Sequence, residues 1–413
     1  MRKICFLTTL IPTQMYSHVN EKSTNNMADA ANALQWNIYD GLCRNYKQGI
    51  KLINILPIGS FPQYYTEPFI ARELFDTQYE KGNVNVGFCN IKLVRNYFQP
   101  RQIFKELLSE FKGVDDGILY VYTISAPIIT AVDLLKRKNK RIKVCSIIAD
   151  LPNMSSLSSQ KSIFQEYFEK YLSKKSYRKT SCIDAYVLLT KYMADYMGIR
   201  KSYCVVEGIS NCEERIQKEL VFDEEYKTVV YTGTLHKRFG VLNLISAFST
   251  IKDDSYRLII CGMGDSEEEV KAAAKIDKRI EYLGQLPRTD VIKIQDEATV
   301  LVNPRQNNEE FTKYSFPSKT MEYLASGNPV VAYKLDGIPD EYDDYVFFVN
   351  GNDIEELAQK IVYVCEMPPE IRKEFGLAGR EYVLNEKNSL VQTEKIKRMM
   401  ELIDGRIENG SAV

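Results

Sequence analysis

Strand-like runs alternate with helical patterns along the whole chain, and no other feature limits the possible folds as strongly. The runs expected as strands are Lys3–Leu10, Lys51–Pro57, Gly117–Thr123, Lys143–Asp150, Ala185–Leu189, Tyr203–Glu207, Thr228–Thr232, Arg257–Cys261, Ile280–Gly284, Thr299–Asn303, Pro329–Ala332 and Val346–Val349. The expected helices are Asn26–Cys43, Gln102–Phe111, Ala126–Lys138, Ser162–Ser173, Lys191–Met197, Val241–Thr250, Ser266–Ala274, Arg288–Glu297, Ser318–Ala325, Asp353–Val364, Pro369–Val383 and Ser389–Ile403. Such alternation is typical of βαβ units, so the sequence predicts an α/β protein. Residues 58–100 carry no clear pattern.

The chain has 413 residues, which is too long for one ordinary hydrophobic core. The polar and charged segment Gly208–Tyr226 separates two series of βα units and is the expected linker. We therefore predict two Rossmann-like domains, one over residues 1–210 and one over residues 226–388. Domains of this kind favour a ligand crevice at the carboxyl ends of their strands, facing between the two.

Composition excludes several classes of protein. Apolar residues make up 45% and charged residues 26%, as in soluble globular chains, and no apolar run approaches the roughly 20 residues of a membrane span. The N-terminal run Met1–Pro12 has no small-residue cleavage site, so we interpret it as a strand and not as a signal peptide. Nine scattered cysteines indicate buried thiols in a reducing compartment. Two histidines without paired spacing argue against a metal site.

Charge is distributed unevenly, although the net charge is only −1. Residues 1–210 carry 28 Lys and Arg against 18 Asp and Glu, whereas the remainder carries 26 against 37. Two basic runs stand out, Lys136–Lys143 and Lys174–Lys179. They are either solvated helix ends and loops or contacts to an anionic membrane surface, where each basic residue contributes about 1 kcal/mol. No stacking motif of aromatic and basic residues accompanies them, so we expect no nucleic acid partner.

The stretch Tyr314–Ala332 combines the features of an anion site. Free N–H groups at a helix start suit a phosphate. The residues that form this start are Tyr314, Ser315, Pro317 and Ser318. Lys319 lies in the first turn, where the helix dipole favours an acid, so a bound diphosphate would explain its position. The alternative is an ordinary surface lysine.

Two further side chains extend this site. Glu322 lies one turn into the helix, where a carboxylate can accept hydrogen bonds from a vicinal diol; otherwise it is a solvated surface residue. Arg305 follows the strand end at Pro304 and could bind two phosphate oxygens with its forked guanidinium, or it is an ordinary loop arginine. Phosphate donors beside a diol acceptor are what a nucleotide-sugar needs.

A second loop, which contains glycine, follows the strand Thr228–Thr232. Its polar or small residues are Gly233, Thr234, His236, Lys237 and Arg238, and a helix begins near Gly240. The alternative is a βα turn with incidental charge, in which the histidine is structural. The Gly-x-Gly at Gly262 and Gly264 lacks the third glycine of the dinucleotide fingerprint, so we interpret it as a tight turn.

In the first half, Asp150 ends a predicted strand. Such an acid can bind an acceptor hydroxyl or stabilise positive charge, and the alternative is a cap or turn residue. Asn25, Asn26 and Gln35 are further polar candidates.

The stretch Phe316–Gly327 and the loop Val229–Gly240 resemble the donor-binding signatures of the retaining family-4 glycosyltransferases. That family has the GT-B fold, in which two Rossmann-like domains face each other across a cleft. The resemblance implies that the last helix, Ser389–Ile403, packs back on the N-terminal domain. It also implies that Glu322 binds ribose hydroxyls as the second acid of a Glu-x7-Glu motif. The loop around Gln285 and Leu286 resembles the loop that receives the nucleotide base.

Three positions depart from the family pattern. Tyr314 stands where the family has the first acid, and Thr234 and Phe239 stand where it has cations that face the phosphates. The expected replacements for these cations are Arg305, Lys319 and either Lys237 or Arg238. The residues expected to be catalytic are Asp150, Lys319 and Arg305.

The resemblance implies transfer of a hexose-type sugar from a nucleotide-sugar to a glycan or lipid-linked saccharide with retained configuration, in surface or capsular polysaccharide biosynthesis. We expect neither a metal nor a cofactor, because cationic side chains would balance the departing diphosphate. We expect a cytoplasmic protein, peripheral at the inner face of the cell membrane. The alternatives are an epimerase or phosphorylase of the same fold and a sugar-nucleotide-binding protein without activity.

Overall fold

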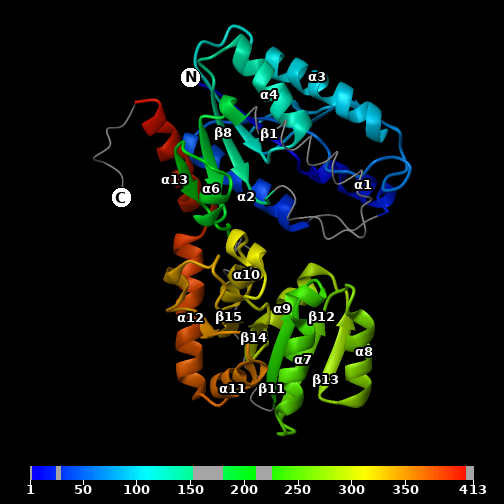
Figure 1. Cartoon of the computed structure of the whole chain (residues 1–413), viewed down its shortest axis with the longest axis vertical. Coiled ribbons are helices and arrows are strands. Elements are labelled where there is room, and N and C mark those ends of the chain that lie inside the picture. The colour runs from blue at the N-terminus through cyan, green and yellow to red at the C-terminus, as the bar shows by residue number, and fades with distance from the viewer. Residues whose placement is uncertain (1, 25–28, 152–179, 211–225, 406–413) are drawn as a thin grey trace. The chain divides into compact units, whose positions relative to one another are not determined.

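The computed structural model describes residues 2–24, 29–151, 180–210 and 226–405 (Figure 1). The predicted helix Ser162–Ser173, the basic run Lys174–Lys179, Asn25, Asn26 and most of the predicted linker lie outside the described residues. The chain forms two compact units. Unit 1 comprises Met1–Glu207 together with Ser389–Val413, and unit 2 comprises Gly208–Asn388.

Unit 1 contains an eight-stranded sheet in the order β10-β9-β8-β7-β1-β2-β5-β4. All neighbours in it are parallel except β4, which runs antiparallel to β5. Its strands are β1 (Lys3–Thr8), β2 (Lys51–Asn54), β4 (Glu73–Phe75), β5 (Asn83–Asn85), β7 (Gly117–Tyr122), β8 (Lys143–Ile148), β9 (Ala185–Leu188) and β10 (Tyr203–Val205). A separate antiparallel pair joins β3 (Phe69–Ile70) to β6 (Phe88–Cys89). The central strands β1 and β7 are almost wholly buried, as expected for a parallel sheet covered on both faces.

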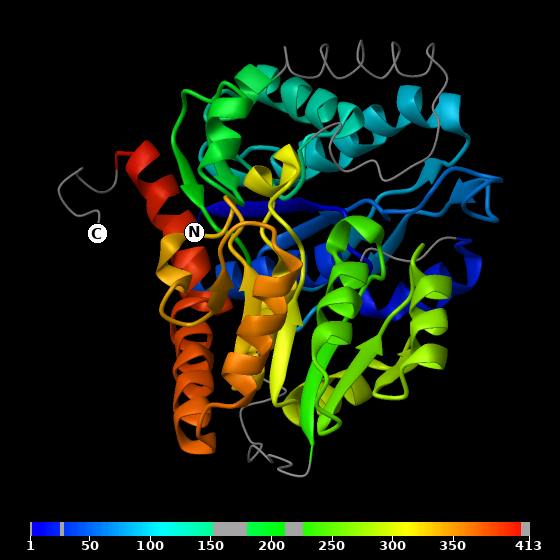
Figure 2. The same ribbon diagram turned by 60° about the horizontal axis from the view of Figure 1, so that its bottom comes forward.

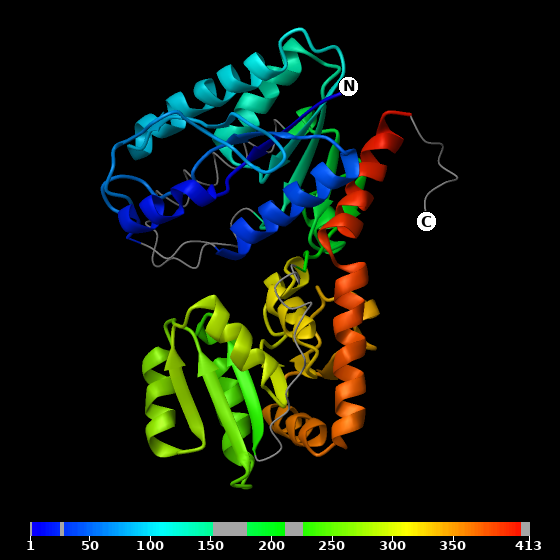
Figure 3. The same ribbon diagram turned by 180° about the vertical axis from the view of Figure 1, so that it is seen from behind.

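The described helices of unit 1 are α1 (Tyr16–Lys22), α2 (Asp29–Tyr46), α3 (Lys92–Glu110), α4 (Ala126–Lys138), α6 (Tyr192–Tyr196) and α13 (Ser389–Ile403). Helices α3 and α4 lie side by side, and α13 packs along α2 (Figure 3). The contact between α2 and α13 is close, because Asn45 donates a hydrogen bond of 2.8 Å to the carbonyl of Leu390. A Cβ at Gly41 would lie 2.2 Å from the carbonyl oxygen of Ser389. The last helix of the chain is therefore part of unit 1.

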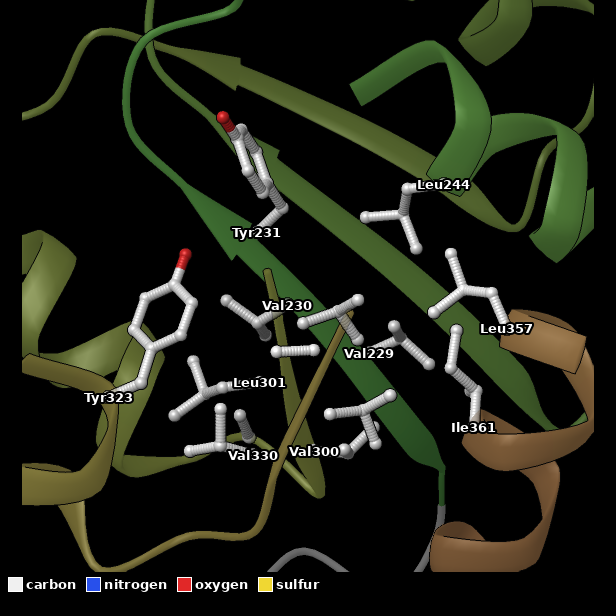
Figure 4. Packing of buried hydrophobic residues seen from close by; sticks show 14 of the residues in the cluster. Val229, Val230, Tyr231, Leu244, Val300, Leu301, Tyr323, Val330, Leu357 and Ile361 are labelled. Carbon is white, nitrogen blue, oxygen red and sulfur yellow. The ribbon is translucent and has the colours of Figure 1, made fainter. Parts of the chain in front are cut away.

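Unit 2 contains a six-stranded parallel sheet in the order β13-β12-β11-β14-β15-β16. Its strands are β11 (Lys227–Thr232), β12 (Tyr256–Cys261), β13 (Ile280–Gly284), β14 (Val300–Asn303), β15 (Val330–Tyr333) and β16 (Phe347–Val349). Its helices are α7 (Val241–Thr250), α8 (Glu267–Ile276), α9 (Arg288–Asp296), α10 (Ser318–Ser326), α11 (Ile354–Cys365) and α12 (Pro369–Glu386). Helix α7 contacts α8 and α11, and helix α10 contacts α9 and α12 (Figure 2). Buried valines of β11 and β14 pack with Leu357 and Ile361 of α11 (Figure 4).

The largest difference from the sequence prediction lies in residues 58–110. Helix α3 begins at Lys92, ten residues before the predicted start at Gln102, and Pro100 lies inside it. Proline removes one helical hydrogen bond and usually marks a helix boundary, so a helix that continues through Pro100 has no clear signal in the sequence. Strands β3 to β6 have two or three residues each, too few for a period-two pattern to be detected.

Among the described helices, none is sufficiently long and apolar to span a lipid bilayer.

Candidate active site

The carboxyl ends of β11 and β14 lie next to each other, because the two strands are parallel neighbours. The chain leaves β11 through Gly233 and leaves β14 through Pro304 and Arg305. These two loops are in direct contact: Gly240 has a φ of +83°, and a Cβ there would lie 2.0 Å from the carbonyl oxygen of Pro304. Only glycine fits such an approach at a positive φ. The loops therefore hold the side chains of residues 231–240 and 303–315 close to the start of α10.

The end of the Lys319 side chain packs against Gly233, the residue that follows β11. A Cβ at Gly233 would lie 1.9 Å from Lys319 Nζ, and Gly233 has a φ of +133°. Lys319 Nζ donates to Tyr231 Oη at 3.2 Å and lies 4.6 Å from the centroid of that ring. Desolvation lowers the pKa of Lys319 to about 8, and the charge of Arg305 adds to this effect while Glu322 opposes it. Because Gly233 has no side chain, there is room beside it for the ammonium group of Lys319, which has no ion pair within the described residues.

Arg305 is a second cation of the same kind. It is buried, donates from Nη2 to Ser315 Oγ at 3.0 Å, and leaves its Nε without a hydrogen-bond partner in the described part of the chain. Its guanidinium carbon lies 4.2 Å from the ring centroid of Phe311 and 5.3 Å from that of Phe239. Burial, together with the charge of Arg238, lowers the pKa of Arg305 to about 10. Such a site holds a charge that a bound anion would stabilise.

The remaining cations of the loop after β11 are already paired. Arg238 Nη2 donates to Glu309 Oε2 at 2.7 Å. Its guanidinium carbon lies 3.9 Å from the ring centroid of Phe311, the same ring that Arg305 contacts. Lys237 is exposed and pairs with Glu269 of α8 at 2.9 Å. His236 accepts a hydrogen bond at Nδ1 from the backbone N–H of Arg238 and lies 3.3 Å from Asp265, so it caps the short helix that follows. Within the described residues, Arg305 and Lys319 are therefore the cations of this region without an acidic partner.

Glu322 is held by a buried glutamine. Gln295 of α9 donates from Nε2 to Glu322 Oε1 at 2.8 Å and to Thr232 Oγ1 at 2.7 Å. Tyr323, next to Glu322 and fully buried, accepts from the N–H of Thr232 at 2.9 Å and donates to its carbonyl at 3.0 Å. These bonds fasten α10 to the end of β11. One carboxylate oxygen of Glu322 is thereby positioned, and the side chain is only half-buried.

The start of α10 is uncapped by side chains. Its N-cap residue is Pro317, which makes no side-chain cap bond, and its first turn contains no acid. The first N–H groups of a helix have no acceptor within the helix, so Ser318 and Lys319 present donors at this point. Ser315 is engaged with Arg305, and Tyr314 donates to Glu310 at 3.2 Å. A helix start next to two cations has the donors and the charge that an anion requires.

The loops at the other edge of this sheet are packed backbone to backbone. A Cβ at Gly262 would lie 1.8 Å from the carbonyl oxygen of Gly233, which agrees with the tight turn that the sequence predicted for this segment. The N–H of Gly262 donates to the carbonyl of Gly284 at 2.7 Å. Gln285 and Leu286 follow directly at the end of β13, where Gln285 is exposed. They lie at the carboxyl edge of the same sheet as Gly233. In the loop after β11, the carbonyl of Thr234 accepts a hydrogen bond from Tyr231 Oη at 2.8 Å.

Asp150 belongs to unit 1 and lies two residues after β8, where it is exposed. The buried hydroxyl of Tyr122 has no hydrogen-bond partner in the described residues, and its pKa is raised by burial and by the charge of Asp150. Gln35, considered as a polar candidate, is instead used inside the fold: it accepts from the N–H of Thr9 at 2.7 Å and donates back to the carbonyl of Thr9 at 3.0 Å. It fixes the loop after β1.

Three contributors to the site were missed in the sequence. Tyr231 and Phe311 supply aromatic faces to the cations, and Gln295 positions Glu322. Tyr231 could have been found, because it lies two residues before the loop glycine. A glutamine in α9 carries no local signal, because its role depends on the packing of α9 against α10.

Comparisons with known proteins point to glycosyltransferases. Residues 213–382 match the family described as Glycosyl transferases group 1. D-inositol 3-phosphate glycosyltransferase of Corynebacterium glutamicum (strain R) is 28% identical over 143 residues, 32% of this chain and 33% of that protein. The putative colanic acid biosynthesis glycosyltransferase WcaL of Escherichia coli (strain K12) is 23% identical over 182 residues, 42% of this chain and 45% of that protein. These matches thus span a third to a half of the relatives' length.

Solved structures match over nearly the whole chain. Sucrose-phosphate synthase from Thermosynechococcus elongatus gives a TM-score of 0.63 at 13% identity and covers 98% of this chain and 100% of its own. Anabaena HepE in complex with UDP gives 0.60 at 12% identity, covering 97% and 100%. The chain is an α/β protein of the GT-B fold. Its residues 213–382, about two fifths of the chain, are similar to the Glycosyl transferases group 1 family.

Proposed function

We propose that this protein transfers a hexose-type sugar from a nucleotide-sugar to a glycan or lipid-linked saccharide with retention of the anomeric configuration. The observation that carries the proposal is the juxtaposition of Lys319 and Arg305, two cations without an acidic partner in the described residues, with the uncapped start of α10 and the half-buried Glu322. Cations and free N–H groups suit a diphosphate, and a carboxylate with one oxygen fixed suits the ribose diol.

In this proposal the chain acts mainly by electrostatic stabilisation. Negative charge develops on the diphosphate as the sugar departs, and Lys319, Arg305 and the α10 N–H groups stabilise that charge without reorganising. Their charges replace those of a metal. Asp150 would lie on the acceptor side, where it orients an acceptor hydroxyl. The resemblance to retaining enzymes supports retention of configuration.

The wider role follows from the relatives. WcaL is named for colanic acid biosynthesis, which supports a role in surface or capsular polysaccharide biosynthesis. The complex of HepE with UDP supports a uridine nucleotide as the first donor to test. We propose a cytoplasmic location, peripheral at the inner membrane face, because residues 1–210 are basic.

A second function is favoured by the departures at Tyr314 and Phe239, where the family has an acid and a cation. With the first acid missing, the chain could bind a sugar nucleotide without transferring it, or epimerise it. Product analysis separates a transferase from these alternatives. A transferase releases nucleoside diphosphate and forms a new glycoside, whereas an epimerase forms no glycoside.

The proposed function is tested by a thermal-shift screen of UDP, GDP, dTDP and their sugars, followed by turnover with the sugar nucleotide that stabilises the protein most. A ligand at 100 times its Kd stabilises the folded state by about 2.7 kcal/mol. We expect one base to give a clear upward shift and the matching sugar nucleotide to be consumed in the presence of a saccharide acceptor. A protein that none of these compounds stabilises would contradict the proposal.

Replacing Glu322 with glutamine is expected to raise the KM for the donor roughly 10- to 100-fold, because a hydrogen bond to a charged group contributes about 1.5–3 kcal/mol. Glu322→Gln keeps the shape and the acceptor oxygen for Gln295, so its thermal midpoint should stay near that of the wild type. Glu297→Gln, an exposed acid just after α9, is the matched control. Steady-state kinetics with an unchanged KM for Glu322→Gln would remove the ribose assignment.

A further inference from the structure

The outer face of α3 combines basic and apolar side chains. Tyr97 is 61% exposed, Phe98 is 48% exposed and Leu108 is 41% exposed. Arg101 and Lys105 are exposed between them along the helix. At 100° per residue all five project within one arc of the helix. Aromatic residues are normally buried, so an exposed cluster of them on one helix face indicates an interaction surface.

The aromatic part of this face is organised. The rings of Tyr97 and Phe98 meet edge to face with centroids 5.0 Å apart. The guanidinium carbon of Arg101 lies 4.1 Å from the centroid of Tyr97, and Arg101 Nη2 donates to Tyr97 Oη at 3.1 Å. The aromatic surface is therefore presented to solvent with a positive charge on it.

Acids are kept off this face. Among the described side chains of α3, the exposed ones are Lys92, Asn96, Tyr97, Phe98, Arg101, Gln102, Lys105, Leu108 and Ser109, none of which is acidic. The two acids of the helix are half-buried and paired, Glu106 with Arg72 at 2.9 Å and Glu110 with Lys3 at 2.6 Å. The uncompensated charge of the outer face is thus positive.

The segment Phe69–Leu74 also exposes apolar side chains, together with the acid Glu73, and it contacts α3 outside the arc of the outer face. Arg72 connects β3 and β4 to α3 through Glu106. Phe69 and Leu74, close to Arg72 in the chain, are 69% and 61% exposed. Figure 1 draws α3 at the margin of unit 1 beside α4.

Half of the basic side chains in the run Lys136–Lys143, in contrast, are paired with acids of the fold. Lys136 is bound to Asp184 at 2.5 Å, Arg137 to Asp133 at 2.8 Å and Arg141 to Asp115 at 3.6 Å. The run also lacks exposed aromatic residues. It cannot supply the apolar contact that a stable peripheral attachment needs.

We propose that the outer face of α3 docks unit 1 on an anionic lipid surface. The basic residues would lie at the headgroups and the rings of Tyr97 and Phe98 would enter the interface, which is the behaviour of an interfacial amphipathic helix. A polyanion such as nucleic acid would satisfy the charges but not the apolar side chains. Pairing of this face with the same face of a second copy would bring like charges together. This inference rests on the peripheral location proposed above, for which it names the contact surface, and it does not depend on the donor site.

The test is cosedimentation of the full chain with vesicles of phosphatidylcholine alone or mixed with phosphatidylglycerol. We expect binding to the anionic vesicles only. The double variant Tyr97→Ala/Phe98→Ala should weaken the apparent affinity about 10-fold or more. The double variant Arg101→Gln/Lys105→Gln should weaken it and also reduce its dependence on salt.

The matched control is Lys360→Gln/Tyr363→Ala on α11. Tyr363 is 58% exposed with Lys360 Nζ 5.9 Å from its centroid, but α11 also exposes Glu355 and Glu356. The control should bind vesicles like the wild type, and all variants should retain the thermal shift given by a nucleoside diphosphate. The proposal is overturned by equal binding to neutral vesicles, by α3 variants that bind like the wild type, or by light scattering that shows a dimer abolished by the α3 variants.

Discussion

Replacing Lys319 with methionine is expected to stabilise the free protein while removing most of its turnover. The folded protein holds this lysine at a pKa of about 8 against an ordinary value of 10.5. Each pKa unit corresponds to about 1.4 kcal/mol, so the charged lysine costs roughly 3 kcal/mol at neutral pH. Methionine fills similar space without the charge. Loss of one electrostatic donor to the transition state typically lowers kcat about 10²- to 10³-fold.

The pH dependence of this stability gain has a definite sign. Because the pKa of Lys319 is lower in the folded than in the unfolded state, the cost is fully present below about pH 8. It is relieved as the pH rises from about 8 towards 10.5, since the unfolded state then binds more protons. The advantage of Lys319→Met in thermal midpoint should therefore shrink above pH 8.

The measurements are calorimetric unfolding at several pH values and donor turnover at neutral pH. Lys313→Met is the matched control, because Lys313 lies in the preceding short helix and is exposed, 3.8 Å from Asp336. It should change neither quantity. A Lys319→Met variant that is less stable than the wild type and turns over normally would show that this lysine is structural.

Replacing Arg305 with methionine is expected to lower kcat/KM by about 10³-fold, the largest loss of any single change considered. Its buried guanidinium is paired with no acid in the described residues and donates only to Ser315, so the variant removes an uncompensated charge and keeps much of the packing against Phe311. Arg305→Lys should recover little, since an ammonium lacks the two-pronged geometry.

Arg238→Met separates the two cations that share the ring of Phe311. Arg238 is paired with Glu309, so its removal should lower kcat/KM much less than that of Arg305. Steady-state kinetics of the three variants, with thermal midpoints measured alongside, decide the point. If Arg238→Met were the more damaging change, the diphosphate would have to be assigned to the loop after β11.

Much of the fold could be predicted because strand and helix periods are local properties. The strand Ile280–Gly284 and the helices Ala126–Lys138, Val241–Thr250 and Ser389–Ile403 have the predicted boundaries. Residues 58–100 could not be predicted, since their short strands are defined by pairing with distant partners and not by their own pattern. The start of α3 was hidden by Pro100, which is accommodated inside the helix.

The candidate site was predictable only where a residue's position on its own element decides its role. Lys319 at a helix start and Arg305 at a strand end are of this kind. Lys237 was an equal candidate in the sequence, and its exposure and its ion pair with Glu269 distinguish it from them. The aromatic surroundings of the cations and the hydrogen bond from Gln295 to Glu322 depend on packing between separate elements.

The most direct measurement is a crystal structure of the chain bound to the nucleoside diphosphate that stabilises it most. The account predicts phosphate oxygens within hydrogen-bonding distance of Lys319 Nζ, the Arg305 guanidinium and the first N–H groups of α10, with the ribose hydroxyls on Glu322. The account would be contradicted by a nucleotide bound elsewhere. It would also be contradicted by phosphates that contact Lys237 and Arg238 but neither Lys319 nor Arg305.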